Sequence, residues 1–195
     1  SKINSNDDLS NITTLGFRGE ALPSIASVSK FLIESKANKS DGMQIDVEYG
    51  KINDIIPSSI SDGTRITVSN LFFNVPARKK FLKSENTEYK NILKIFKVFA
   101  LSYPNINFFL SHNNKEVFNL KISNYENRIN DLFKNEYKGK LIPINFTKDS
   151  IKINGYIGNL STIKKRKGQQ FIFINGRYVK NRLIDITINN SYKYL

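Results

Sequence analysis

The sequence contains no cysteine and a single histidine, His112, and these scarcities exclude several kinds of site. Without cysteine the chain forms no disulfide and no thiolate metal site, so a reducing compartment is the expected location. One histidine cannot form a histidine-cluster metal site, and most nucleophile–base triads are unavailable without cysteine or a second histidine. We therefore expect no metal ligands in this chain, and an enzyme of this composition would act on phosphates or carboxylates.

Long apolar runs are also absent. No segment approaches the roughly 20 apolar residues that a helix needs to cross a bilayer, and no signal peptide opens the sequence. We therefore expect a cytoplasmic location and no membrane partner. Hydrophobic residues make up 39% of the 195 residues, which is enough for one large or two small domains with real cores.

Acidic residues are few relative to basic ones. Lys and Arg number 30, against 17 Asp and Glu, which gives a formal net charge of +13. Such an excess raises the affinity for polyanions, so nucleic acid is the expected partner. The chain is also rich in Lys, Asn and Ile, a bias that A/T-rich coding produces without selection for binding, so the charge alone is weak evidence.

The segment over residues 14–29 places two glycines, Gly16 and Gly19, ahead of a run of helix-forming residues. Glycine lets the backbone turn tightly, and a helix start presents free N–H groups and the positive end of the peptide dipoles. With Arg18 beside it, this segment is suited to hold a phosphate. The spacing alone is equally typical of a plain loop before a helix, because it matches neither a Walker A loop nor a G-x-G-x-x-G loop.

Short apolar runs and the alternation of apolar and polar residues predict strands, and the early strands suggest an antiparallel sheet with one buried, helix-covered face. The predicted strands are residues 31–35, 43–49, 64–69, 106–112, 115–120, 140–147, 151–160 and 170–174. Asn113-Asn114 and Asn175-Gly176 have the residues of two-residue hairpin turns.

Helical spacing predicts a short helix over residues 18–27 and a long helix that ends before Pro104. Ser123 and Glu126 have the spacing of a capping box that opens a third helix. Residues 183–195 fit both a strand and a helix. In the long helix the predicted inward side chains are Tyr89, Ile92, Leu93, Phe96, Phe99 and Ala100, and the predicted solvated ones are Lys90, Lys94 and Lys97.

Three motifs follow one another along the chain: the glycine loop within residues 14–29, Gly63-Thr64 followed by residues 71–83, and the Phe-Ile-Asn-Gly-Arg segment at residues 173–177. In this order they resemble the signatures of the MutL family of DNA mismatch-repair ATPases, which belong to the GHKL group with gyrase B, Hsp90 and histidine kinases. The resemblance covers the whole chain, and it favours a helix for residues 183–195.

The resemblance implies an α+β fold. We expect residues 1–121 to form the later part of a GHKL-type (Bergerat) α/β sandwich, with the lid end, the phosphate loop, the sheet and the long helix. Residues 122–195 are expected to form a ribosomal protein S5 domain 2-like α/β domain, truncated at its C-terminus.

The resemblance also implies an ATP site, with Mg²⁺ in the complete module. The loop backbone would hold the phosphates, Thr64 would lie near the adenine, and the first residues resemble the end of the family's nucleotide lid. Glu20 belongs to the loop and is not expected to be a catalytic base. The implied ATP-binding residues are Ser1, Lys2, Gly16, Phe17, Arg18, Gly19, Glu20, Ala21, Leu22 and Thr64.

The catalytic residues of the family are not found in these 195 residues. Its general-base Glu and Mg²⁺-binding Asn lie on an upstream helix, its Asp-x-Gly-x-Gly motif follows that helix, and a lysine that reaches the γ-phosphate lies downstream. We therefore expect this chain alone not to turn over ATP.

For the parent protein the resemblance implies an ATP-driven switch that dimerises, clamps DNA and links mismatch recognition by a MutS-like sensor to later repair steps at a bacterial nucleoid. Basic side chains would contact the DNA backbone without sequence specificity. The candidates are Lys79, Lys80, Lys165, Arg166, Arg177 and Arg182. An alternative is a non-enzymatic nucleic-acid module that uses residues 16–19 as a KH domain uses its Gly-x-x-Gly loop, although a KH domain is much shorter.

Overall fold

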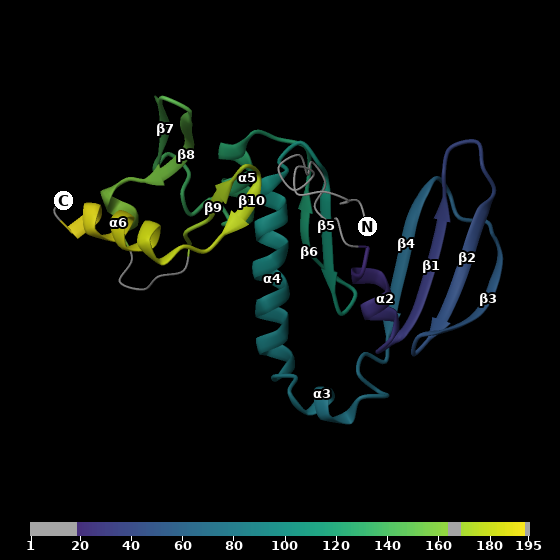
Figure 1. The fold of residues 1–195 in the computed structure, drawn as a ribbon. Helices are drawn as coiled ribbons and strands as arrows, with labels where there is room; N and C mark the ends of the chain where they lie inside the picture. The colour runs from purple at the N-terminus through teal and green to yellow at the C-terminus, as the bar shows by residue number, and fades with distance from the viewer. Residues whose placement is uncertain (1–18, 164–168, 194–195) are drawn as a thin grey trace. The chain divides into compact units, whose positions relative to one another are not determined.

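The computed structural model describes residues 19–163 and 169–193, and the chain divides into two compact units. The first unit ends at Ser84 and the second begins at Glu85. We describe each unit by itself, with the labels of Figure 1. The predicted domain boundary after Lys121 lies inside the second unit and stays a prediction.

The first unit is a four-stranded antiparallel sheet in the order β3-β2-β1-β4, with two short helices (Figure 1). Three of the strands were predicted, β1 from its apolar run and β2 and β4 from their alternating residues, while β3 was not. The elements are α2 (Ala21–Ala26), β1 (Lys30–Lys36), β2 (Gly42–Glu48), β3 (Lys51–Ser58), β4 (Gly63–Ser69) and α3 (Pro76–Lys80).

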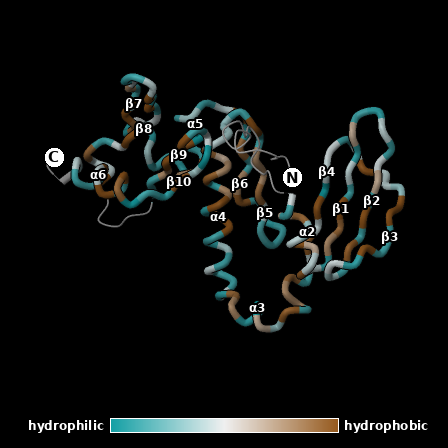
Figure 2. The backbone as a smooth tube through the Cα atoms, in the orientation of Figure 1, coloured by the Kyte–Doolittle hydropathy of each residue, from teal (hydrophilic) through white to brown (hydrophobic). Residues whose placement is uncertain are grey.

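The two faces of this sheet differ in polarity. Paired residues of neighbouring strands share a face, so the register places Phe31, Val47 and Val68 together on one face and Glu34 with Arg65 on the other. Hydrophobic residues recur along the strands (Figure 2). Ala26 of α2 packs against Phe31 and Val47 in a small buried cluster, so α2 covers part of the apolar face, while Ile66 and Val68 of β4 stay exposed.

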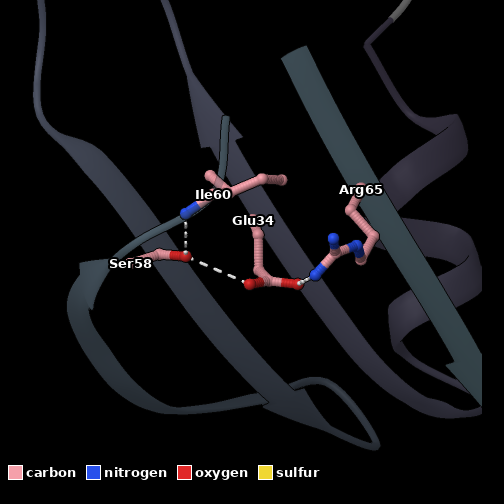
Figure 3. Close-up of polar contacts among 4 residues, drawn as sticks. All are labelled: Glu34, Ser58, Ile60 and Arg65. Carbon is pink, nitrogen blue, oxygen red and sulfur yellow. Dashed lines mark hydrogen bonds and ion pairs between the residues drawn. The ribbon is translucent and has the colours of Figure 1, made fainter. Parts of the chain in front are cut away.

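On the polar face, Glu34 joins three strands (Figure 3). Its carboxylate accepts hydrogen bonds from Arg65 Nη1 and from Ser58 Oγ, each at 3.0 Å. The Ser58 hydroxyl in turn accepts from the backbone N–H of Ile60 at 3.3 Å. The ends of β3 and β4 are thereby held to the central strand β1.

The second unit combines α4 with two further helices, a 3₁₀ turn and three two-stranded sheets. The predicted hairpins at Asn113-Asn114 and Asn175-Gly176 are both present, with positive φ at each turn residue. The elements are α4 (Glu85–Ser102), β5 (Phe108–His112), β6 (Lys115–Leu120), α5 (Tyr125–Leu132), β7 (Leu141–Lys148), β8 (Ile151–Gly158), η1 (Leu160–Thr162), β9 (Ile172–Ile174), β10 (Arg177–Val179) and α6 (Arg182–Lys193).

The core of the second unit lies where α4 meets α5 and the β5–β6 hairpin. Its buried members are Ala100, Leu101, Leu120, Leu132, Phe133 and Tyr137. The aromatic rings of Phe96 and Phe118 stack on its border with centroids 5.3 Å apart. This one cluster includes residues from both sides of the predicted domain boundary.

The buried stripe of α4 matches the predicted one in part, since Ala100 is buried and Tyr89, Leu93 and Phe96 are half-buried. Ile92 and Phe99 were expected to point inward, yet they are 54% and 41% exposed, while Leu101 is buried. Lys97 was interpreted as solvated, but its Nζ lies 4.5 Å from the centroid of the Phe133 ring. Burial lowers the pKa of Lys97, and Glu136 opposes this shift. The helical pattern thus identifies the centre of the covered side, while contact with Phe133, next to α5, shifts its border to Lys97.

The start of α5 also differs from its prediction. Asn124, not Ser123, is the N-cap, and its Oδ1 accepts the backbone N–H of Asn127 at 2.8 Å. The Ser123 hydroxyl instead accepts a long hydrogen bond, 3.5 Å, from Nε of Arg128. At the start of α6, which was expected to be a helix, Asn181 Oδ1 accepts two backbone N–H groups.

Replacing Gly42 by Ala tests the packing of β2 against the end of β3. A Cβ at this buried position would overlap the backbone carbonyl oxygen of Ser58, which cannot move without disturbing the strand pair. We expect Gly42→Ala to lower the free energy of unfolding by about 1–3 kcal/mol, measured by urea titration. Asp41→Ala, at the exposed neighbouring residue, is the control, and equal stability of the two variants would refute this packing.

Replacing Lys97 by Met tests the burial of its ammonium group. Because its pKa is lowered, the folded state releases this proton at a lower pH than the unfolded chain does. In that alkaline window the unfolded state binds more protons, so the stability of the wild type rises with pH relative to the variant. We expect Lys97→Met to be the more stable protein at neutral pH and this advantage to shrink through the window.

Unfolding free energies measured over a pH series give the result, with Lys90→Met on the exposed side of the same helix as the control. An advantage of Lys97→Met that stays constant at every pH would contradict a buried ammonium.

Candidate functional site

The candidate phosphate loop leads into α2, and the described part begins at Gly19. Gly19 has a φ of 72°, the left-handed region that glycine adopts without strain, and no atom lies near the place of a Cβ. Glu20 is the N-cap of α2 but makes no capping hydrogen bond with its side chain. Ala21 and Leu22 form the exposed first turn, which contains no acidic residue. Gly16, Phe17, Arg18, Ser1 and Lys2 lie outside the described residues.

The other end of α2 is fixed by hydrogen bonds from distant segments. The backbone N–H of Gly50 donates to the carbonyl oxygen of Ala26 at 3.0 Å, and Asn74 Nδ2 donates to that of Ser27 at 3.1 Å. The backbone N–H of Phe72 donates to the carbonyl oxygen that follows, on Val28, at 2.7 Å. The second family-like motif, residues 71–83, therefore anchors the helix that the first motif opens.

Thr64 lies on the same face of the sheet as the residues that α2 covers. Its hydroxyl and that of Ser35 are 2.8 Å apart across β1 and β4. The register gives this face otherwise apolar residues on β1, β2 and β4: Phe31, Ile33, Met43, Ile45, Val47, Ile66 and Val68. Ser35 is four residues beyond Phe31 along β1, a distance of about 13 Å. The hydroxyl pair is a polar spot on an apolar face, away from the α2 cluster.

The predicted DNA-contacting residues that the structure describes are all exposed. Lys79 and Lys80 lie on α3 in the first unit, and Lys79 Nζ is 5.9 Å from the Phe73 ring centroid. Arg177 begins β10 and Arg182 begins α6, both in the second unit. Lys165 and Arg166 lie outside the described residues.

Two further lysines, which sequence reasoning did not select, line one open groove of the second unit. Lys94 comes from α4 and Lys180 follows β10, and the groove between them has a volume of about 460 Å³. Its floor is apolar, from Ile95, Val98 and Tyr178. Lys180 is three residues after the candidate Arg177, and this proximity could have identified it from the sequence. No sequence pattern links Lys180 to Lys94.

Groups that bind metal are sparse in this chain. Over residues 19–163 and 169–193, no three His, Cys, Asp or Glu side chains gather as a possible metal site. The helices of this same part of the chain include none that is long and apolar enough to cross a membrane.

Comparison with known proteins gives one consistent result. Residues 129–195 match the family model described as the DNA mismatch repair protein, C-terminal domain. The chain is 40% identical over 196 residues to the DNA mismatch repair protein MutL of Flavobacterium psychrophilum, covering 100% of this chain and 32% of that protein. It is 37% identical over 193 residues to MutL of Chlorobium phaeobacteroides, covering 98% of this chain and 31% of that protein.

A solved structure, the Aquifex aeolicus MutL ATPase domain complexed with ADP, has a TM-score of 0.75 and 29% identity to this chain. The match covers 96% of this chain and 71% of that one. The chain thus spans about a third of the length of the curated relatives that it matches. The expected α+β fold is confirmed: this chain has the fold of a MutL ATPase domain and belongs to the MutL family of DNA mismatch repair proteins.

Proposed function

We propose that the protein containing this chain is an ATP-driven mismatch-repair switch, and that Gly16, Phe17, Arg18, Gly19, Glu20, Ala21 and Leu22 hold the nucleotide phosphates. The observation that carries this proposal is the left-handed turn at Gly19 ahead of an anchored helix. In the first turn of α2, Pro23 has no N–H, so the free donors are the N–H groups of Ala21 and Leu22, and no acidic side chain of that turn competes for them. The Aquifex aeolicus relative was solved with ADP.

Hydroxyl groups on the apolar sheet face would add a second contact for the nucleotide. Thr64 and Ser35 offer hydroxyl groups for the polar edge of a base, at the end of the face away from α2. Ser1 and Lys2 would belong to the segment that covers the nucleotide. ATP with Mg²⁺ supplies the charge and the phosphoryl group when bound, and this chain's own part is to bind and orient the phosphates.

The basic side chains would hold DNA by its backbone. Lys79, Lys80, Lys165, Arg166, Arg177 and Arg182 are joined in this proposal by Lys94 and Lys180, whose groove has two cations above an apolar floor. Lysine contacts with phosphates release counterions and carry no sequence information. The binding would therefore be tight at low salt and independent of sequence.

The remaining parts of the proposal concern the whole protein. ATP binding would bring two copies together through their nucleotide-binding modules, and a MutS-like mismatch sensor would recruit the dimer to DNA. The protein would act in the cytoplasm at the nucleoid. The similarity to bacterial MutL proteins, at about 40% identity, supports this proposed role in mismatch repair.

Gly19→Val tests the phosphate loop. A β-branched residue at a φ of 72° is strained by roughly 1–2 kcal/mol, so we expect the full-length protein to bind ATP about tenfold more weakly or worse. Calorimetric titration with a non-hydrolysable ATP analogue and Mg²⁺ measures this. Gly139→Val introduces the same strain at a φ of 69° in open space within the other unit, and it should leave affinity unchanged.

Equal affinity for ATP in the two glycine variants would remove the loop from the proposal. A wild-type protein that ignores ATP but binds DNA would favour the alternative, a plain nucleic-acid module.

Replacing both groove lysines tests the DNA contacts. We expect Lys94→Gln with Lys180→Gln to reduce the slope of log affinity against log salt concentration by about 2 in total, because two phosphate contacts are lost. Fluorescence anisotropy with a short duplex over a salt series measures the slope. Lys115→Gln, an exposed change in the β5–β6 hairpin, is the control, and an unchanged slope in the double variant would exclude the groove from the DNA site.

A further inference from the structure

A buried arginine joins α5 to the two connections that flank the β5–β6 hairpin. Arg128 is fully buried. Its Nη2 donates to the carbonyl oxygens of Pro104 at 2.8 Å, Ile106 at 2.9 Å and Lys121 at 2.8 Å. This nitrogen carries two hydrogens, so at least one of them is shared between two carbonyls.

The three carbonyls belong to two separate segments. Pro104 and Ile106 lie in the connection between α4 and β5, whereas Lys121 follows β6. The segments are also tied directly, since the N–H of Ser123 donates to the carbonyl of Pro104 at 3.0 Å. Asn107 Oδ1 accepts the N–H of Ile122 at 2.9 Å. Arg128 thus lies at the meeting point of α4, the hairpin and α5.

The arginine makes this junction without an acidic partner. No salt bridge to Arg128 is formed within the described residues, its Nη1 has no hydrogen-bond partner there, and its Cζ lies 5.6 Å from the Phe108 ring centroid. Burial lowers the pKa of Arg128, and the nearby Asp131 only partly opposes this. A buried cation without a carboxylate is costly, so a position that needed only packing would favour an apolar residue. What the guanidinium adds, and an apolar side chain could not, is hydrogen bonds to three backbone carbonyl oxygens at once.

We propose that Arg128 is a positioning residue that locks α4 and the β5–β6 hairpin to α5. The connection after Lys121 is then a rigid joint and not a hinge, although it is the predicted domain boundary. The shared core supports this, because Ala100 and Leu101 of α4 pack with Leu132 of α5. Phe171 and Phe173, on either side of the start of β9, border the same cluster.

The joint also has a consequence for the groove. Lys94 lies before the joint in sequence and Lys180 after it, yet both line one groove. By holding α4 to the rest of the unit, Arg128 would keep the spacing between the two lysines fixed. This last step alone rests on the proposed function, because it gives the groove a DNA phosphate to bind.

Hydrogen exchange of the full-length protein tests the joint without nucleotide or DNA. Arg128→Met keeps the length of the side chain but removes every donor. We expect exchange in residues 104–107 and 121–124 to become faster together by about tenfold or more. Arg128→Lys retains a cation with three N–H donors and should keep most of the protection.

Phe118→Ala is the matched control, because it weakens the same core through the stacked Phe96 ring without touching Arg128. It should accelerate exchange in α4 and β6, without a specific acceleration in residues 104–107 and 121–124. An even acceleration across the unit in Arg128→Met, or no acceleration, would overturn the proposal. So would equal opening in Arg128→Lys and Arg128→Met, since packing alone would then explain the residue.

A DNA measurement gives the second readout. In the wild-type background, the effects of Lys94→Gln and Lys180→Gln on DNA affinity should be coupled in a double-mutant cycle. The same cycle in the Arg128→Met background should show no coupling, whereas in the Phe118→Ala background the coupling should remain. If the coupling persists in the Arg128→Met background, Arg128 does not fix the spacing between the two lysines. If the wild-type protein binds no DNA, the proposed function fails and the exchange result still decides whether Arg128 is a joint.

Discussion

The packing of α2 on the apolar face of the β3-β2-β1-β4 sheet is the contact on which the candidate nucleotide site depends. Alternation along the strands gives the sheet one apolar face, and Ala26 of α2 closes over Phe31 and Val47 on it. Hydrogen bonds to the carbonyls of Ala26 and Ser27 then fix the end of the helix. The helix held in this way is only six residues long, and it begins two residues after Gly19. A loop that has to receive phosphates gains from this preorganisation.

In the second unit two cationic side chains take part in the packing, of which Arg128 is fully buried and Lys97 is half-buried. Lys97 lies on the Phe133 ring and Arg128 gathers three carbonyls, and neither has a carboxylate in contact among the described residues. Each costs desolvation free energy that an apolar side chain would avoid. In exchange, Arg128 satisfies backbone groups at the junction of α4, β5–β6 and α5. Geometry at this junction is therefore set by directed hydrogen bonds as well as by hydrophobic packing.

Much of the fold could be predicted from the sequence, because the strongest patterns are local. An apolar run identified β1, alternation identified β2 and β4, and the Asn-Asn and Asn-Gly pairs identified two hairpins. β3 was missed because its sequence carries Pro57 and an Ile-Ile pair instead of alternation, as an edge strand with two exposed sides permits. On α4 the pattern placed Phe96 and Ala100 correctly, but the border of the buried stripe at Lys97 depends on the contact with Phe133, and no pattern within α4 contains that information.

The residues of the candidate site also fall into those that the sequence predicted and those that it did not. Three short motifs predicted the loop, Thr64 and the family, since those motifs are continuous in sequence. Lys94 and Arg128 could not be selected, because their roles arise only when the fold brings β10 or the two hairpin connections to them. Residue type alone made Lys94 one of several lysines on a helix.

The most direct measurement is hydrogen exchange of the full-length protein with and without a non-hydrolysable ATP analogue and Mg²⁺. We expect the analogue to slow exchange in the loop over residues 16–22 and through α2, because bound phosphates would occupy the free N–H groups and stabilise the helix. If the analogue leaves exchange in this segment unchanged at a saturating concentration, the α2 loop is not the phosphate site.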